Sequence, residues 1–285
     1  HHLEGLSLQQ QGEHEAAIAA FDRALAQRPE ALEPLIAVAR SELALRRFDD
    51  AESRVRTVLE ANPTNVFARN LLGDVYLASG KIDQALAEFE EAVIAHPKSP
   101  RAYVRLSQVL RAQGNPAAAR ATLEKGVRET DRSGYLVLQL AVLLEQLGET
   151  DAAVEAYEDV LARFPSARVA SNNLAMLLAT KVGDPAALDR ALALARPLAD
   201  SDVPAFLDTL GWVHYLRGEY DQALPYLEKA VAARPDSAEL RYHLGMNLFK
   251  IGRADEAREH LSAAAADENF YGREEAQKAL TVLGG

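Results

Sequence analysis

The sequence predicts an all-α fold, a solenoid of helical hairpins, and three observations indicate it. Alanine and leucine dominate a composition with only 6% aromatic residues, which favours helices. Two kinds of helix-breaking residue recur at intervals of 34 residues, of twice 34, or of twice 34 plus two. Such phasing indicates an internal repeat, and stacked repeats build an extended surface rather than a closed pocket. The two series are Gly12, Gly80, Gly114, Gly148, Gly218 and Gly252, and Pro29, Pro63, Pro97, Pro165 and Pro235.

Residues 66–99 show the repeat unit most clearly. Apolar residues such as Leu72 and Tyr76 follow the i, i+3, i+4, i+7 spacing of amphipathic helices in two successive segments. Gly80 is expected to end the first helix, because glycine adopts a positive φ at little cost. Pro97 is expected to end the second, since it lacks an N–H donor and clashes with the preceding turn. The unit is therefore predicted to be a helical hairpin.

This unit resembles the tetratricopeptide (TPR) repeat, whose pattern is L-G-x-x-Y…A-x-x-x-F…A…P. The residues that match the pattern are Leu72, Gly73, Tyr76, Ala85, Phe89, Ala92 and Pro97. The resemblance covers essentially the whole chain and implies a right-handed superhelical solenoid of about eight hairpins. The expected array covers residues 1–271, in units of about 1–31, 32–65, 66–99, 100–133, 134–167, 168–203, 204–237 and 238–271.

Three units depart from the pattern. Arg46 replaces the turn glycine of the second unit, and residues 130–134 replace the terminal proline of the fourth. The sixth unit is two residues longer, and its turn is stretched through residues 181–185. Within that stretch we expect Asp184 to be a helix N-cap and Pro185 to be the first helical residue.

The two ends of the chain differ. Residues 272–285 are expected to form a capping helix, because the last hairpin would otherwise expose its stacking face. The first repeat lacks its opening residues, so the chain is expected to be a fragment of a longer array. His1 and His2 are interpreted as the remnant of an affinity tag.

Charge and composition exclude several function classes. A net charge of −11 argues against nucleic acid or an anionic membrane as the main partner. The absence of cysteine excludes disulfides and thiolate metal sites. Gly80-Lys81 lacks the rest of a phosphate loop, and His14-Glu15 lacks a second histidine at helical spacing. His214 stands where the repeat has tyrosine, so a packing role is expected. We predict a non-enzyme without cofactor, metal or catalytic residues.

The resemblance also implies a binding surface. In the TPR family, positions 2, 5, 9 and 12 of each first helix line the concave groove, and this spacing places them on one helical face. In units two to four these positions are mixed and charged, and the polar groove residues singled out are Arg40, Asn70, Asp74, Gln108 and Arg111. In units five to eight they are more apolar, and the predicted partner-binding residues are Tyr135, Leu138, Asn172, Met176, Asp208, Trp212, Tyr215, Tyr242, Met246 and Phe249.

The apolar wall contains the single tryptophan and both methionines of the chain. Exposed apolar groups mark interaction sites, aromatic residues are common at binding hot spots, and methionine adapts to irregular partners. Asn172 and Asp208 would add groups that bind a peptide backbone or a sugar hydroxyl. The alternative is that tight curvature, or another segment of a longer chain, buries this wall. No unit carries the Lys and Asn pair of TPR modules that clamp a chaperone carboxylate.

The C-terminal third has a narrower resemblance, to TPR lipoproteins of PEP-CTERM/exosortase systems associated with exopolysaccharide production. It rests on residues 171–175, 207–212, 240–245 and 270–273. It implies a scaffold of the bacterial periplasm or cell envelope that binds a protein partner during assembly of polysaccharide or surface proteins. Two alternatives stay open: a cytoplasmic adaptor of an enzyme complex, and a carbohydrate-binding module that stacks sugars on Trp212, Tyr215 and Tyr242.

Overall fold

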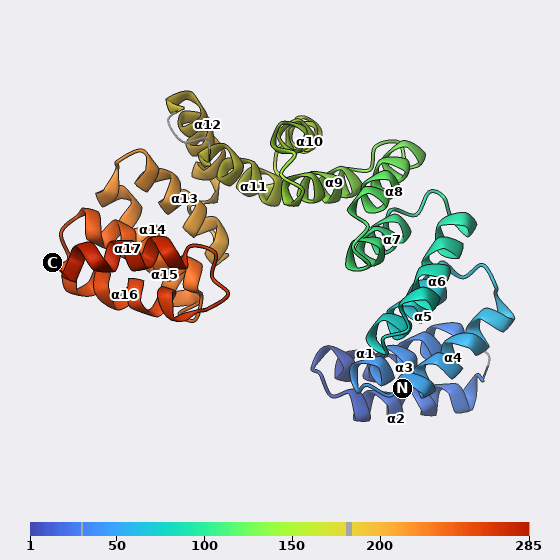
Figure 1. The fold of residues 1–285 in the computed structure, drawn as a ribbon. Coiled ribbons are helices and arrows are strands. Elements are labelled where there is room, and N and C mark those ends of the chain that lie inside the picture. The colour runs from blue at the N-terminus through green and yellow to red at the C-terminus, as the bar shows by residue number, and fades with distance from the viewer. Residues whose placement is uncertain (30, 181–183, 285) are drawn as a thin grey trace. The chain divides into compact units, whose positions relative to one another are not determined.

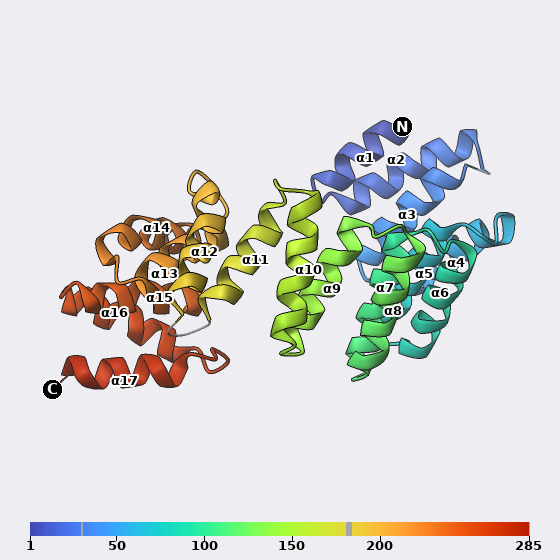
Figure 2. The same ribbon diagram turned by 90° about the horizontal axis from the view of Figure 1, so that it is seen from above.

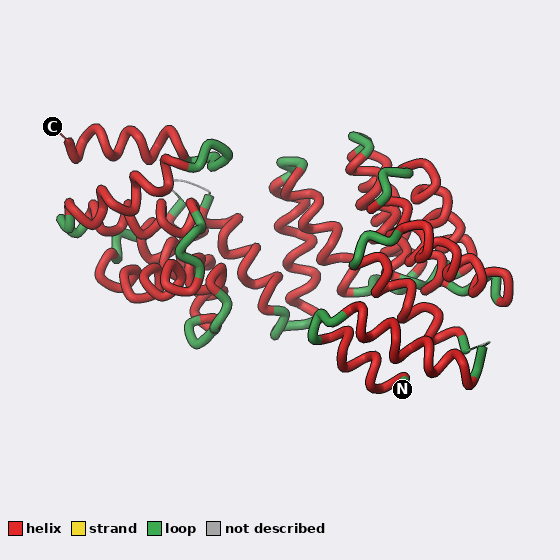
Figure 3. The backbone as a smooth tube through the Cα atoms, turned by 90° about the horizontal axis from the view of Figure 1, so that it is seen from below, coloured by secondary structure: helices red, strands yellow, loops and turns green. Residues whose placement is uncertain are grey.

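The computed structural model describes residues 1–29, 31–180 and 184–284. In these ranges every regular element is a helix and no strand is present, as Figure 3 shows. The all-α class that the repeat predicts is therefore confirmed. The chain divides into two compact units, His1–Gly148 (unit 1) and Glu149–Gly285 (unit 2).

The helices of unit 1 are α1 (His2–Gln10), α2 (His14–Gln27), α3 (Leu32–Ala44), α4 (Phe48–Ala61), α5 (Val66–Ala78), α6 (Ile82–Ala95), α7 (Pro100–Ala112), α8 (Pro116–Glu129) and α9 (Gly134–Gln146). The helices of unit 2 are α10 (Thr150–Arg163), α11 (Arg168–Ala179), α12 (Pro185–Ala195) with the 3₁₀ turn η1 (Arg196–Leu198), α13 (Pro204–Leu216), α14 (Tyr220–Ala233), α15 (Ala238–Lys250), α16 (Ala254–Ala266) and α17 (Arg273–Gly284).

Within each unit, consecutive helices pack as hairpins (Figures 1 and 2). The first helix of a hairpin also contacts the first helix of the next, as α5 contacts α7 and α13 contacts α15. This places the groove positions of neighbouring repeats side by side. None of the described helices combines the length and the apolar character needed to cross a bilayer.

Small residues allow the two helices of a hairpin to approach closely. A Cβ atom added to Gly73 would lie 2.5 Å from the Phe89 ring, and one added to Gly211 would lie 2.7 Å from Leu227. A larger residue at either position would therefore clash unless the facing side chain moved. The glycine at this position of the hairpin therefore has a steric cause in both units.

The turns between paired helices require a left-handed backbone. Gly80 has a φ of 78°, and Arg46, which replaces the turn glycine in the second repeat, has a φ of 61°. A left-handed conformation costs a side-chain-bearing residue roughly 1–2 kcal/mol. Asp131 and Arg132, with φ values of 50° and 58°, lie in the connection between α8 and α9. In other repeats this connection contains a proline.

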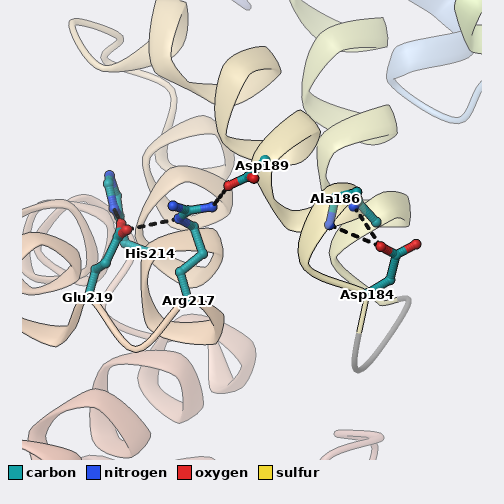
Figure 4. A network of polar contacts seen from close by, with 7 residues as sticks. Asp184, Ala186, Asp189, His214, Arg217 and Glu219 are labelled. Atoms are coloured by element: carbon teal, nitrogen blue, oxygen red, sulfur yellow. Dashed lines mark hydrogen bonds and ion pairs between the residues drawn. The ribbon is translucent and has the colours of Figure 1, made fainter.

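Asp184 caps α12, as its position before Pro185 predicts. Its Oδ1 atom accepts hydrogen bonds from the backbone N–H groups of Ala186 at 3.0 Å and Ala187 at 3.1 Å (Figure 4). These bonds satisfy donors that the start of a helix leaves free. Residues 181–183, which belong to the stretched turn predicted for the sixth unit, lie outside the described residues.

The last helix, α17, covers the end of unit 2. Ala276 and Ala279 are buried in a cluster with Leu261 of α16, and Tyr242 and Met246 of α15 pack against the same cluster. The helix thus covers apolar surface of the final hairpin, which would otherwise face solvent.

Candidate interaction surface

A row of aromatic side chains lies along the first helices of unit 2. The Trp212 indole of α13 stacks on Tyr215 of the same helix, with ring centroids 4.5 Å apart and planes inclined by 9°. It also stacks on His243 of α15, at 3.9 Å and 18°. Tyr242 is tilted against Trp212 at 6.0 Å. These four residues, Trp212, Tyr215, Tyr242 and His243, are called the aromatic row below.

The aromatic row corrects the expectation that this wall is open to solvent. Trp212, Tyr215 and Tyr242 are half-buried. Tyr215 and His243 both lie nearly parallel to the indole and make no ring contact with each other, so they cover opposite faces of it. A sugar ring could stack on Trp212 only by displacing one of them. The cause is His243, which lies outside the four groove positions of its repeat but whose ring stacks on Trp212.

Asp208 is also not the open polar group that the sequence predicts. Its side chain is buried, and His243 Nδ1 lies 2.9 Å from both carboxylate oxygens. A buried carboxylate without a partner is strongly unfavourable, so the histidine is needed to hold it. Because the same imidazole stacks on Trp212, this polar contact also fixes the aromatic row.

Burial changes the acid–base properties of the phenols in the row. It raises the pKa of Tyr215 to about 12, with smaller contributions from the nearby Tyr242 and Tyr220. Burial, together with Glu275, also raises the pKa of Tyr242. A phenol is already protonated at neutral pH, and the raised pKa values keep these two hydroxyl groups protonated, and able to donate hydrogen bonds, further into the alkaline range.

The other predicted residues of this wall are less accessible than expected. Asn172 is buried; its Nδ2 lies 3.3 Å from Asn173 Oδ1, while its own Oδ1 has no partner among the described residues. Met176 is half-buried. Met246 packs against the cluster under α17, and Phe249 packs against the hairpin core of α13 to α16. Met246 and Phe249 therefore contribute to the packing of the hydrophobic core.

The remaining two residues of the predicted wall lie in the other unit. Tyr135 and Leu138 belong to α9, which is part of unit 1. Tyr135 is 50% exposed and Phe67, at the same repeat position in α5, is 64% exposed. Two strongly exposed aromatic groove residues therefore lie in unit 1, Phe67 in the third repeat and Tyr135 in the fifth.

The polar groove residues of unit 1 form a cluster of charged and amide groups. Arg105 of α7 pairs with Asp74 of α5 at 3.1 Å and also donates to Gln108 Oε1 at 3.2 Å. Burial raises the pKa of the Asp74 carboxyl, and the charges of Arg105, Arg101 and Arg40 act in the opposite direction. The cluster therefore surrounds one carboxylate with three guanidinium groups.

The other residues singled out here differ in exposure. Arg40, Gln108 and Arg111 are exposed, and Arg111 donates a hydrogen bond to Gln146 of α9. Asn70 is buried; its Nδ2 donates to the carbonyl of Val66 at 2.7 Å, and its Oδ1 has no partner among the described residues. Arg101 occupies a groove position of the fourth repeat, whereas Arg105 lies outside the four groove positions and was missed, although its i, i+4 spacing from Arg101 on α7 was a signal that both reach the groove.

A second polar network joins α12 to the turn between α13 and α14 (Figure 4). Arg217 pairs with Asp189 of α12 and with Glu219 at 2.9 Å, and Glu219 also bonds His214 at 2.6 Å. Burial alone would raise the pKa of Glu219, but the bonds from His214 and Arg217 outweigh it and lower this pKa. His214 is buried beside the parallel ring of Tyr226, so it packs and pairs within the hairpin.

The described residues offer no arrangement for metal chemistry. No group of three or more His, Asp or Glu side chains among them is placed to hold an ion. The polar networks above join neighbouring helices, and each is accounted for by packing within its unit. What the two groove faces offer is contact area, hydrogen bonds and charge.

Comparison with known proteins identifies the repeat. A tetratricopeptide repeat model matches residues 8–75, 110–179 and 214–283, together more than half of the chain, and a second tetratricopeptide repeat model matches residues 70–133. The chain is 28% identical over 176 residues to the TPR repeat-containing protein PA4667 of Pseudomonas aeruginosa, which is 60% of this chain and 29% of that protein. It is 24% identical over 247 residues to the BBSome complex member BBS4 of Bos taurus, and the match covers 87% of this chain and 47% of that protein. The chain thus spans less than half the length of either relative.

Two solved structures have the same fold. The APC/C hetero-tetramer Cut9-Hcn1 contains a chain that aligns with a TM-score of 0.63 at 18% identity, covering 98% of this chain and 54% of that one. Yeast Tom70 aligns with a TM-score of 0.60 at 16% identity, covering 95% and 58%. Tetratricopeptide repeat proteins, the family whose models match this chain, bind protein or peptide partners.

Proposed function

Since the chain belongs to the tetratricopeptide repeat family, we propose that it is a non-catalytic scaffold whose groove face binds a segment of a partner protein. The observation that carries this proposal is the aromatic row of unit 2, in which Trp212, Tyr215 and Tyr242 keep part of their surface exposed on the face that the first helices share. Aromatic side chains provide large contact areas and are frequent at binding hot spots.

The rigidity of the row supports the same function. Ordering a flexible side chain at an interface costs roughly 0.5–1.5 kcal/mol. Here the Trp212 ring is already fixed between Tyr215 and His243, and His243 is fixed by Asp208. A partner that docks on the row therefore meets side chains that have lost this freedom during folding. The protonated Tyr215 and Tyr242 hydroxyls would donate hydrogen bonds at the rim.

We place this scaffold in the bacterial cell envelope, in the assembly of polysaccharide or surface proteins. The support is the resemblance of residues 207–212 and 240–245 to envelope TPR lipoproteins, and these segments contain Asp208, Trp212, Tyr242 and His243. The sequence of the gene upstream of residue 1 tests this placement. A signal peptide with a lipobox cysteine is expected, and a chain that fractionates with the cytoplasm would favour an adaptor of a cytoplasmic enzyme complex instead.

Site-specific photo-cross-linking in the source organism tests the binding face. A photoreactive phenylalanine derivative at Tyr242 is expected to trap a discrete partner protein, because Tyr242 belongs to the row and keeps part of its surface exposed. The matched control carries the same group at Gln222, an exposed position on α14. Equal trapping at both positions, or none at Tyr242 in cells that contain the intact protein, would argue against the groove face of unit 2 as the interface.

A further inference from the structure

Two adjoining cavities open on the groove face of unit 1, between α7 and α9. The smaller has a volume of about 130 Å³ and the larger of about 410 Å³. Val104 and Gln108 of α7 line both. Because the two cavities share this wall, a single bound segment could place neighbouring side chains in both.

The larger cavity is cationic. Its lining includes Arg101 and Arg105 of α7 and the half-exposed ring of Tyr135 of α9. Arg105 is engaged by Asp74, whereas Arg101 is exposed and has no hydrogen bond or ion pair within the described part of the chain. Arg40 of α3 adds a third guanidinium near Asp74. In a chain with a net charge of −11, this face therefore has a local excess of positive charge.

The smaller cavity has an apolar floor and a polar rim. The apolar part of its lining, called the floor, consists of Val104, Leu123, Val142 and Leu143, and the buried Ser107 lies beside them. Arg111 and three glutamine side chains form its rim. A cavity of roughly 150 Å³ lined by aliphatic side chains holds a molecule the size of benzene. A small aliphatic side chain therefore fits the floor. The amide groups of Gln108, Gln139 and Gln146 at the rim can pair with a peptide backbone, since an amide both donates and accepts.

We propose that these cavities form one site for an extended, acidic peptide segment. An Asp or Glu side chain would bind between Arg101 and Arg105, and a Val or Leu side chain two residues away would enter the smaller cavity. Side chains two apart on an extended chain point to the same side and lie about 7 Å apart. The inference rests on the proposed function in that it assigns a partner chemistry to the groove face, but it concerns unit 1 and uses none of the aromatic row.

The apolar floor favours a peptide over an acidic polysaccharide. A uronate polymer carries carboxylates that would also pair with Arg101 and Arg105. Its hydroxyl groups, however, would leave the floor formed by Leu123 and Leu143 without an apolar partner and would themselves lose water there. The test therefore includes a uronate oligomer as a competing ligand.

Fluorescence anisotropy of short, blocked, labelled peptides on the full chain tests the site. The reference peptide has Glu and Leu two residues apart in a Gly-Ser background, and its blocked termini remove the terminal charges. Replacing Glu by Gln, or Leu by Ser, is expected to weaken binding about tenfold in each case, since each change removes one of the two anchors. Affinity for the reference peptide is also expected to fall as salt rises.

Variants of the protein locate the binding. Arg101→Glu is expected to weaken binding of the reference peptide at least tenfold. The matched control is Arg128→Glu at an exposed position on α8, which changes the net charge equally and should leave the affinity unchanged. Val142→Phe fills the smaller cavity and should remove the preference for Leu over Ser. Circular dichroism confirms that each variant is folded.

Several results would overturn the inference: equal binding of the Glu and Gln peptides, equal effects of Arg101→Glu and Arg128→Glu, no peptide binding, or tighter binding of the uronate oligomer. None of these results bears on cross-linking through Tyr242, which lies in unit 2. A partner trapped at Tyr242 together with no peptide binding would reject this inference and keep the proposed function.

Discussion

The groove faces of the two units are built on the same repeat and differ in what fills them. In unit 2, Trp212, Tyr215 and His243 stack on one another and a buried Asp208 holds the row. In unit 1, arginine and glutamine side chains border two cavities, and Tyr135 projects with half of its surface exposed. The face of unit 2 is apolar, and its side chains largely pack on one another. The face of unit 1 is cationic and open to solvent.

This difference shows that the hairpin repeat leaves the groove positions free to vary. The helices pack through residues such as Gly73 against Phe89 and Gly211 against Leu227, which lie on other faces of the first helices. Side chains at the groove positions can therefore pack on each other, as in unit 2, or remain available, as in unit 1, without changing the architecture.

The largest expected effect concerns the buried support of the aromatic row. His243→Leu removes the partner of Asp208 and leaves a buried carboxylate unpaired, which typically costs about 3–5 kcal/mol. We expect unit 2 to lose that much stability in urea unfolding followed by Trp212 fluorescence, since Trp212 is the only tryptophan. The double variant Asp208→Leu/His243→Leu should recover most of the loss. A loss below about 1 kcal/mol for the single variant would show that the pair does not hold the row.

A smaller effect is expected at high pH. Burial raises the pKa of Tyr215 to about 12 in the folded chain, whereas an unfolded tyrosine has its ordinary pKa of 10.0. Above pH 10 the unfolded state therefore binds fewer protons, and the free energy of unfolding falls as pH rises, by about 3 kcal/mol at most. The contribution of Tyr215 to the free energy of unfolding is fully present below about pH 10. It is lost as the pH rises through the pKa of Tyr215 in the folded chain, about 12.

Tyr215→Phe should therefore flatten this alkaline loss relative to the unsubstituted chain. Urea unfolding followed by far-UV circular dichroism at several pH values between about 9 and 12 measures it. Parallel pH profiles for the two proteins would mean that Tyr215 is not protected from solvent, and the contrast between a filled and an open face would weaken.

The two units can also be compared at a position outside the groove, the turn between the two helices of a hairpin. Arg46 adopts a φ of 61° in unit 1, and Gly218 adopts 77° at the corresponding turn of unit 2. Arg46→Gly is expected to stabilise unit 1 by about 1 kcal/mol, reduced by loss of the contact between the guanidinium and Phe48. Gly218→Arg should destabilise unit 2 by a similar amount. Hydrogen exchange measured on peptides from each unit separates the two effects, and changes of the same sign would contradict the explanation.

The smallest effect is expected at Asp74, the unit 1 counterpart of the buried pair. Asp74 is partly exposed and burial raises its pKa, so replacing it removes both an unfavourable desolvation and the pair with Arg105. Asp74→Asn should change stability by less than about 1 kcal/mol. It should strengthen binding of the acidic reference peptide, because the local positive charge grows. Weaker peptide binding in this variant would indicate that Asp74 positions Arg105 for the ligand.

Much of the fold could be predicted because the repeat is a local pattern. Gly80, Pro97 and the cap at Asp184 act through the backbone of a few neighbouring residues, so their positions indicate where helices start and stop. The groove residues could be assigned to one helical face from their spacing for the same reason, and their role in binding stays a prediction. Their exposure could not be predicted, because it depends on residues 35 positions away, as His243 and Asp208 show.

The sequence by itself determined that this chain is an array of helical hairpins, since the intervals between glycines and prolines set helix lengths through local backbone sterics. Only the tertiary structure decided which groove residues are available to a partner. Stacking brings side chains from successive first helices together, and whether they bury one another depends on size, charge and rotamer across that contact. This is why the wall that contains the tryptophan is packed on itself, and why a cationic cavity and a smaller cavity with an apolar floor lie open between α7 and α9.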